Sequence, residues 1–189
     1  THSALEAVVF AVSMLEDDAL FNAGIGSQIQ SDGNIRMSAA LMNGETQKMS
    51  GVINIENVKN PIQVAEVLMK EDDRILGGSG ATNYARQHGF EEFSTEIPQR
   101  RTEYEAKVKS LGLGTVGCVA LDAAGKIAVA TSTGGKGFEL VGRISDSATV
   151  AGNYANQFCG VSLTGVGEDI VSNATATKIV TRVTDGFSL

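Results

Sequence analysis

The chain contains no tryptophan, only two cysteines, two histidines and two prolines, and no run of about twenty apolar residues. The shortage of aromatics and the net charge of −7 argue against a nucleic-acid partner, which needs clustered Lys and Arg. Without an apolar run or a recognisable leader, we expect a soluble, cytoplasmic protein with no membrane partner. Cys118 and Cys159 lack a spacing suited to zinc, so we expect them to be reduced, buried and inert.

Glycine, by contrast, is abundant, with 22 residues among 189. Many of these glycines stand in Gly-Gly, Gly-x-Gly or Thr-Gly pairs, which favours close backbone approach over a flexible linker. A chain of this length can bury one substantial core. We therefore expect a single domain over residues 1–189.

Hydrophobic periodicity predicts the following helices and strands: helices over 1–15, 61–69, 81–88 and 168–183, and strands over 27–31, 34–42, 48–55, 115–121, 126–132, 150–156 and 160–163. Asp32-Gly33 is expected to be the turn of a hairpin between the first two strands. Charged residues dominate 91–113, which predicts an exposed helix or a mobile linker. The order of elements predicts an α+β sandwich of two stacked, mainly antiparallel sheets with helices outside.

The segment 114–122 reads GTVGCVALD, a small residue and a hydroxyl before a strand-like apolar run. We predict that the backbone is cut between Gly114 and Thr115, because a mobile polar segment ends there. Thr115 would then carry a hydroxyl nucleophile and a free α-amino group, whose pKa of about 7.7–8.0 suits a base near neutral pH. Such a site needs no histidine, and neither His2 nor His88 has a promising context.

Thr-Gly pairs recur at the edges of predicted strands, in Gly114-Thr115, in TSTGG (131–135) and in TGVG (164–167). A hydroxyl beside a bare backbone N–H can form an oxyanion hole. The alternative is that Thr favours strands and Gly favours turns, so that any β-rich protein contains such pairs. A similar choice concerns residues 16–26, which are either a solvated helix end and turn or a loop whose carbonyls wrap a hard cation.

Arg143 and Asp146 lie three residues apart in a segment rich in Gly and Ser. The guanidinium offers a planar fork for a carboxylate, and the carboxylate could hold an ammonium. Together they could grip both ends of an α-amino acid. The alternative is a surface ion pair that contributes little to stability.

Four motifs occur in order, namely GTVGCVALD (114–122), TSTGG (131–135), GRISDS (142–147) and TGVGE (164–168). Together with LEDD (15–18), LFNAG (20–24) and NPI (60–62), they closely resemble the plant-type L-asparaginase / isoaspartyl aminopeptidase family of N-terminal nucleophile (Ntn) hydrolases. The resemblance covers nearly the whole chain. It implies the αββα Ntn-hydrolase sandwich and a zymogen that autocatalytic cleavage divides into an α-subunit part, 1–114 with a mobile linker at about 91–113, and a β-subunit part, 115–189.

The resemblance also implies roles for single residues. Four would be catalytic: Thr115 as the nucleophile, Thr133 as a hydrogen-bond partner of the Thr115 hydroxyl, and Thr164 with Gly165 as the oxyanion hole. Four would bind substrate or lie beside the nucleophile: Arg143 for the α-carboxylate, Asp146 and the Gly167 carbonyl for the α-ammonium, and Asn22 close to Thr115. No cofactor is expected in catalysis, whereas a structural sodium ion would be held by the carbonyls of Leu15, Glu16, Asp18, Phe21, Ala23 and Ile25.

The implied activity is hydrolysis of L-asparagine and of β-aspartyl dipeptides through an acyl-enzyme on Thr115, in a homodimer of cleaved protomers. Ser38 and Asn43 stand where the family usually has Asp, and family members extend further at both ends. An inactive or truncated homologue that binds amino acids is therefore one alternative. Another is an N-terminal-Thr hydrolase of the glycosylasparaginase or endopeptidase type. Arg143 and Asp146 disfavour an endopeptidase, because they demand a free amino-acid head group.

Overall fold

A five-stranded sheet runs through the centre of the computed structural model, which describes residues 2–107 and 114–187. Its strands follow the order β3-β2-β1-β5-β4. The strand bounds are β1 Met37–Asn43, β2 Lys48–Ile55, β3 Ile75–Gly77, β4 Val116–Leu121 and β5 Ile127–Thr133. Neighbouring strands pair antiparallel, except that β2 and β3 pair parallel.

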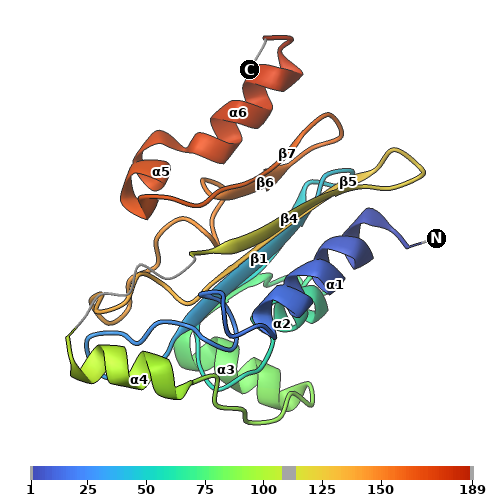
Figure 1. Ribbon diagram of the computed structural model, residues 1–189. Coiled ribbons are helices and arrows are strands. Elements are labelled where there is room, and N and C mark those ends of the chain that lie inside the picture. The colour runs from blue at the N-terminus through green and yellow to red at the C-terminus, as the bar shows by residue number, and fades with distance from the viewer. Residues whose placement is uncertain (1, 108–113, 188–189) are drawn as a thin grey trace.

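A second sheet of two antiparallel strands, β6 (Asn153–Ala155) and β7 (Gly160–Ser162), packs against the first. The helix bounds are α1 Ala4–Glu16, α2 Pro61–Leu68, α3 Gly78–Gln87, α4 Pro98–Glu105, α5 Gly167–Asn173 and α6 Thr175–Thr184. In Figure 1, α1 and α2 lie on one side of the large sheet, while β6 and β7 lie on the other side beneath α6. The expected αββα order of layers is confirmed. Each helix in the described part of the chain is too short or too polar to cross a bilayer.

Strand β1 is buried on both faces because it separates two cores. Leu41 belongs to the large core beneath α1 and α2, whereas the next residue, Met42, packs with Val129 of β5 and Ala155 of β6. Successive side chains of a strand point to opposite faces, so one strand can serve both cores. Strand β5, which ends at Thr133, pairs with β1 in the large sheet and contacts both strands of the second sheet.

Helix α1 confirms the helix expected over 1–15 and begins at a capping box. The Ser3 hydroxyl accepts a hydrogen bond from the Glu6 N–H, and the Glu6 carboxylate accepts one from the Ser3 N–H. Two backbone donors that the helix cannot satisfy are thereby paired. Val8 and Val12 are fully buried against the sheet.

The hairpin expected between residues 27–31 and 34–42 is wrong. Its turn exists, since the Gly33 N–H donates to the Gln30 carbonyl at 3.0 Å and Gly33 has a φ of +84°. However, 27–31 forms no strand, and β1 starts only at Met37. The longer strands β2 and β5 pair with the two edges of β1 instead.

The single helix expected over 168–183 is two helices. Ala174 has a φ of +47°, in the left-handed region, and separates α5 from α6. A left-handed residue ends an α-helix by turning the chain away from its axis. Because the apolar periodicity continues across Ala174, the sequence pattern did not reveal the break between the two helices.

Part of the charged segment over 91–113 is α4, and one of its charges is buried. Arg100 is only 3% exposed, and its Nε donates to the Gly26 carbonyl at 2.8 Å. Arg100 also pairs with Glu103 at 2.9 Å. The helix is therefore anchored to the loop that follows α1. Residues 108–113 of the expected linker lie outside the described residues.

Candidate active site

Thr115 lies one residue before β4, at the point where β4 meets β5. The register pairs Val116 with Ser132, so Thr115 stands beside Thr133. Its Oγ1 donates a hydrogen bond to Thr133 Oγ1 at 3.0 Å. The Gly135 N–H donates to the same Thr133 oxygen at 3.2 Å and holds it in place. Thr133 can therefore orient the Thr115 hydroxyl.

A solvent-open cleft that Thr115 helps to line lies beside this residue. Six of the residues singled out from the sequence line it together: Thr115, Thr133, Arg143, Asp146, Gly165 and Gly167. The outermost two, Thr115 and Gly167, lie fifty-two positions apart in the sequence, and the fold brings all six to one place.

Thr164 lies on the other side of Thr115, in a groove along β4 that is lined by both threonines. A Cβ placed on Gly114 would stand 3.3 Å from Thr164 Oγ1. The Thr164 hydroxyl is therefore close to the backbone that joins Gly114 to Thr115. This position suits a donor to an oxygen that becomes negatively charged next to Thr115.

Arg143 is paired with a carboxylate that the sequence did not single out. Its Nε and Nη2 donate to the two oxygens of Glu168 at 2.7 and 3.1 Å. These bonds to Arg143 are the largest cause that lowers the pKa of Glu168 to about 2, and they raise the pKa of the Arg143 guanidinium. A ligand carboxylate that binds Arg143 thus competes with Glu168. The only sequence signal was the place of Glu168 directly after the TGVG motif.

Asp146 supplies a buried negative charge beside the Arg143 guanidinium. It is 6% exposed, and its Oδ1 accepts a hydrogen bond from the Ser145 hydroxyl at 2.9 Å. The same hydroxyl accepts from Arg143 Nη2 at 2.8 Å, so Ser145 links the two charges. A cation and an anion fixed side by side match the carboxylate and ammonium of an α-amino acid.

Asn22 braces the loop that follows Thr133. Its Nδ2 donates to the Gly135 carbonyl, and its backbone carbonyl accepts from the Gly134 N–H at 2.8 Å. The Oδ1 accepts from the Gln28 N–H at 2.9 Å. These contacts place Asn22 behind the loop, so its contact with the site runs through Gly134 and Gly135.

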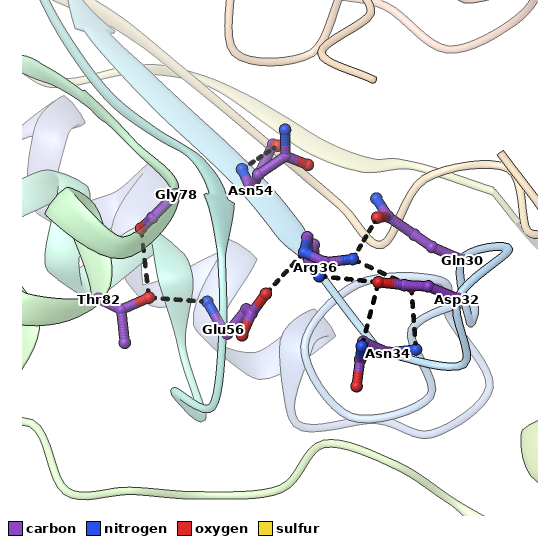
Figure 2. A network of polar contacts seen from close by, with 9 residues as sticks. Gln30, Asp32, Asn34, Arg36, Asn54, Glu56, Gly78 and Thr82 are labelled. Atoms are coloured by element: carbon purple, nitrogen blue, oxygen red, sulfur yellow. Dashed lines mark hydrogen bonds and ion pairs between the residues drawn. The ribbon is translucent and has the colours of Figure 1, made fainter. Parts of the chain in front are cut away.

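One wall of the cleft is a network of polar side chains around Arg36, which sequence reasoning missed. Figure 2 shows the guanidinium between two carboxylates, Glu56 at 2.6 Å from Nε and Asp32 at 3.0 Å from Nη2. Nη1 also donates to the buried Gln30 at 2.8 Å. No local pattern marks these residues, because the network joins the turn at 30–34 to the ends of two strands.

Ser38 and Asn43, which stand where the resembling family has Asp, lie at opposite ends of β1. Ser38 lines the cleft, and its hydroxyl accepts from the Asn54 N–H at 3.1 Å. Asn43 lies at the opposite end of β1, where it caps the turn into β2 by accepting from the Glu45 N–H at 2.9 Å. Only the first of these departures can touch a ligand in the cleft.

The two cysteines are unpaired and partly buried rather than fully buried as expected. Burial raises the pKa of the Cys118 thiol above its ordinary value. A raised pKa keeps a thiol protonated at neutral pH and therefore poorly nucleophilic.

The loop after α1 brings together backbone carbonyls that could hold a hard cation. The Glu16 carbonyl accepts from the Ile25 N–H at 2.7 Å. A Cβ on Gly24 would overlap the Glu16 carbonyl oxygen, and one on Gly26 would stand 2.9 Å from that of Phe21. Each carbonyl oxygen has a second lone pair, and oxygen is the ligand that hard cations prefer. The donor set expected for sodium, the carbonyls of Leu15, Glu16, Asp18, Phe21, Ala23 and Ile25, stays a prediction.

The side chain of Glu16 joins this loop to the catalytic strand. Its Oε1 accepts from the Ser132 hydroxyl at 2.6 Å and from the Ile62 N–H at 3.1 Å. Oε2 is buried and has no hydrogen-bond partner among the described residues. Burial raises the pKa of this carboxyl to about 8, so it is mostly protonated in the folded protein at pH 7.

Substitution of Glu16 by glutamine is expected to change how stability depends on pH. Because the folded protein holds this proton up to about pH 8 and the unfolded chain releases it near pH 4.5, the contribution of Glu16 to stability falls as pH rises between these values. In Glu16→Gln this loss disappears, which flattens the slope by at most about 1.4 kcal/mol per pH unit. Urea unfolding at several pH values measures the slope.

Glu45→Gln is the matched control for this prediction, because it makes the same substitution at an exposed side chain. A Glu16→Gln protein whose unfolding free energy follows the wild-type pH curve would show that Glu16 is ionised in the fold.

Comparison with known proteins places the chain in a family. The asparaginase family model matches residues 1–107 and 94–189. The chain is 48% identical to the isoaspartyl peptidase/L-asparaginase of Synechocystis sp., over 99% of the chain and 62% of that protein. It is 40% identical to the isoaspartyl peptidase/L-asparaginase of Xenopus laevis (98% and 65%) and 38% identical to the plant-type L-asparaginase of Pyrococcus abyssi (92% and 64%).

The chain spans slightly less than two thirds of the length of each of these relatives. The two matched stretches of the family model overlap and together include every residue of the sequence. The chain therefore belongs to the asparaginase family.

Proposed function

We propose that the protein is an autoproteolytically activated amidohydrolase that cleaves L-asparagine and β-aspartyl dipeptides. The observation that carries this proposal is the 3.0 Å hydrogen bond between the Thr115 and Thr133 hydroxyls, at a cleft that also holds Arg143 and Asp146. The cleft thus offers a nucleophile and a pair of charges for an amino-acid head group. The names of the relatives support the same substrates.

Maturation would use the hydroxyl of Thr115 on the preceding peptide bond. Oγ1 attacks the Gly114 carbonyl carbon, the C–N bond breaks, and the Thr115 nitrogen takes up the proton. Water then hydrolyses the resulting ester and leaves a carboxylate on Gly114 and a free amine on Thr115. Residues 1–114 and 115–189 would become the two parts of one folded unit.

In each turnover, the free amine of Thr115 would take the proton of its own hydroxyl. The oxygen attacks the side-chain carbonyl of the substrate, and the Thr164 hydroxyl with the Gly165 N–H stabilises the negative oxygen. The leaving nitrogen receives the proton and departs as ammonia or as an amino acid. Water, activated by the same amine, hydrolyses the ester on Thr115 and releases aspartate.

Substrate selection would depend on the charges at the far end of the cleft. Arg143 would bind the α-carboxylate, while Asp146 and the Gly167 carbonyl would bind the α-ammonium. An internal peptide bond of a protein offers neither group, which disfavours an endopeptidase.

The remaining expectations stay proposals for this chain. A structural sodium ion bound by the loop at 15–25 would stiffen the path from α1 to Asn22. No cofactor takes part in the proposed steps, which use only side chains, backbone groups and water. We further propose a cytoplasmic homodimer of cleaved protomers, with Asn22 holding the loop beside the nucleophile.

Hydrolysis assays test the proposal directly. The purified protein should release aspartate from L-asparagine and from β-Asp-Leu, and it should leave an unfolded protein and a glycosylated asparagine intact. Binding of aspartate with a raised Tm but without turnover of any substrate would favour the inactive amino-acid-binding homologue. Cleavage of the glycosylated asparagine alone would favour a glycosylasparaginase.

A further inference from the structure

Among the residues that the structure describes, three cationic side chains line the cleft, namely Arg36, Lys136 and Arg143. Two of them already have a partner or a proposed role. Arg36 is held between the carboxylates of Asp32 and Glu56, which more than balance its charge (Figure 2). Arg143 is the proposed site of the substrate α-carboxylate. The third cation, Lys136, is therefore available to bind a further anionic group of the ligand.

Within the described part of the chain, the ion pair of Lys136 is a loose one. Its Nζ stands 3.8 Å from Glu168 Oε1, beyond the usual length of roughly 2.7–3.2 Å for a hydrogen bond, and its side chain is 56% exposed. Glu168 is also the carboxylate that pairs with Arg143 at 2.7 Å. Because both cations approach the same carboxylate, the two positive groups lie close together at one end of the cleft.

The backbone beneath Lys136 is anchored on both sides. Gly135 accepts the hydrogen bond from Asn22, and the Phe138 N–H donates to the Ile29 carbonyl at 2.9 Å. The ring of Phe138 stacks on Tyr104 of α4, with 5.3 Å between the ring centres. The loop therefore holds Lys136 at the cleft although the side chain itself is exposed.

We propose that Lys136 binds the α-carboxylate of the leaving amino acid in a β-aspartyl dipeptide and so determines specificity. This inference rests on the proposed function. Both proposed substrates share the aspartyl head group, but only the dipeptide carries a second carboxylate, a few bonds from the first. Two neighbouring cations match two neighbouring carboxylates, whereas L-asparagine, which loses ammonia, needs only Arg143.

The first test measures how Lys136→Met changes the KM for three substrates. Lys136→Met is assayed with β-Asp-Ala, with β-Asp-alaninamide, which lacks the second carboxylate, and with L-asparagine. The KM for β-Asp-Ala should rise about five-fold at unchanged kcat, as expected for an exposed ion pair that binds ground state and transition state alike. The KM for the other two substrates should change less than two-fold. Lys126→Met, which removes an exposed lysine paired with Glu45 outside the cleft, is the control.

Ionic strength supplies a measurement on the unmodified protein. The ratio of the KM for β-Asp-Ala to that for β-Asp-alaninamide should rise with salt, because salt screens an exposed ion pair. Lys136→Arg should keep the ratio of the wild type.

Several results would overturn the inference. An equal rise in KM for all three substrates would assign Lys136 to the shared head group, and unchanged KM values would leave it without a role. A KM ratio that does not respond to salt would contradict the ion pair even if Lys136→Met failed to fold. A wild-type protein that hydrolyses none of the three substrates would overturn the proposed function itself, and this inference with it.

Discussion

Thr115→Ala is expected to lower the turnover of L-asparagine and β-aspartyl dipeptides by about 10⁴-fold or more, since removal of a nucleophile costs most of the catalysed rate. The variant also lacks the hydroxyl that would attack Gly114, so its chain should stay uncut. Its fold should persist, because the Thr115 side chain is only partly buried and lies at the start of a strand. Aspartate release and the length of the purified chain measure the two effects.

Thr115→Ser is the matched variant, because it keeps the hydroxyl and loses only a methyl group. It should retain cleavage and measurable turnover. Turnover by Thr115→Ala within ten-fold of the wild type would remove Thr115 from the catalytic role, and equal inactivity of Ala and Ser variants that both stay folded would question the hydroxyl as the reacting group.

Gly167→Ala is expected to block the head-group end of the cleft. A Cβ at this position would overlap Ser145 Oγ and stand 2.6 Å from Asp146 Oδ1 and 3.0 Å from Arg143 Nη2. The methyl group would displace the two charges proposed to bind the amino-acid head group. Loss of one charged hydrogen bond is worth about 1.5–3 kcal/mol, so kcat/KM should fall about 100-fold for both substrates.

Gly80→Ala is the control for this effect. None of the described residues would lie within 4 Å of a Cβ at Gly80, and the residue is in α3, where alanine is a better helix former than glycine. Its kcat/KM and Tm should therefore match or exceed those of the wild type. Wild-type kinetics in Gly167→Ala would show that the head group does not bind between Arg143 and Asp146.

Local periodicity predicted most elements but not those decided by distant partners. Lys48–Ile55 and the helix after Pro61 were expected where they occur, because each buries an apolar face that its own residues define. Residues 27–31 form no strand, and both edges of β1 are paired with other strands: β2, which follows it directly, and β5, which lies far away in the sequence. Nothing local to Ala174 marks the left-handed turn that separates α5 from α6.

Sequence motifs likewise predicted some residues of the candidate site and missed others. Motifs indicated Thr115, Thr133 and Arg143, which line one cleft in the structure. Arg36 and Glu168 were missed, because the segments that carry them meet their partners only in the folded chain. A charged residue is most often solvated, so its sequence position alone does not distinguish it.

Mass spectrometry of the purified protein under denaturing conditions tests most directly whether Thr115 acquires a free amino group. We predict two fragments of the chain, one that ends at Gly114 and one that begins with Thr115. A single intact chain after prolonged incubation, with no fragment that starts at Thr115, would contradict this mechanism.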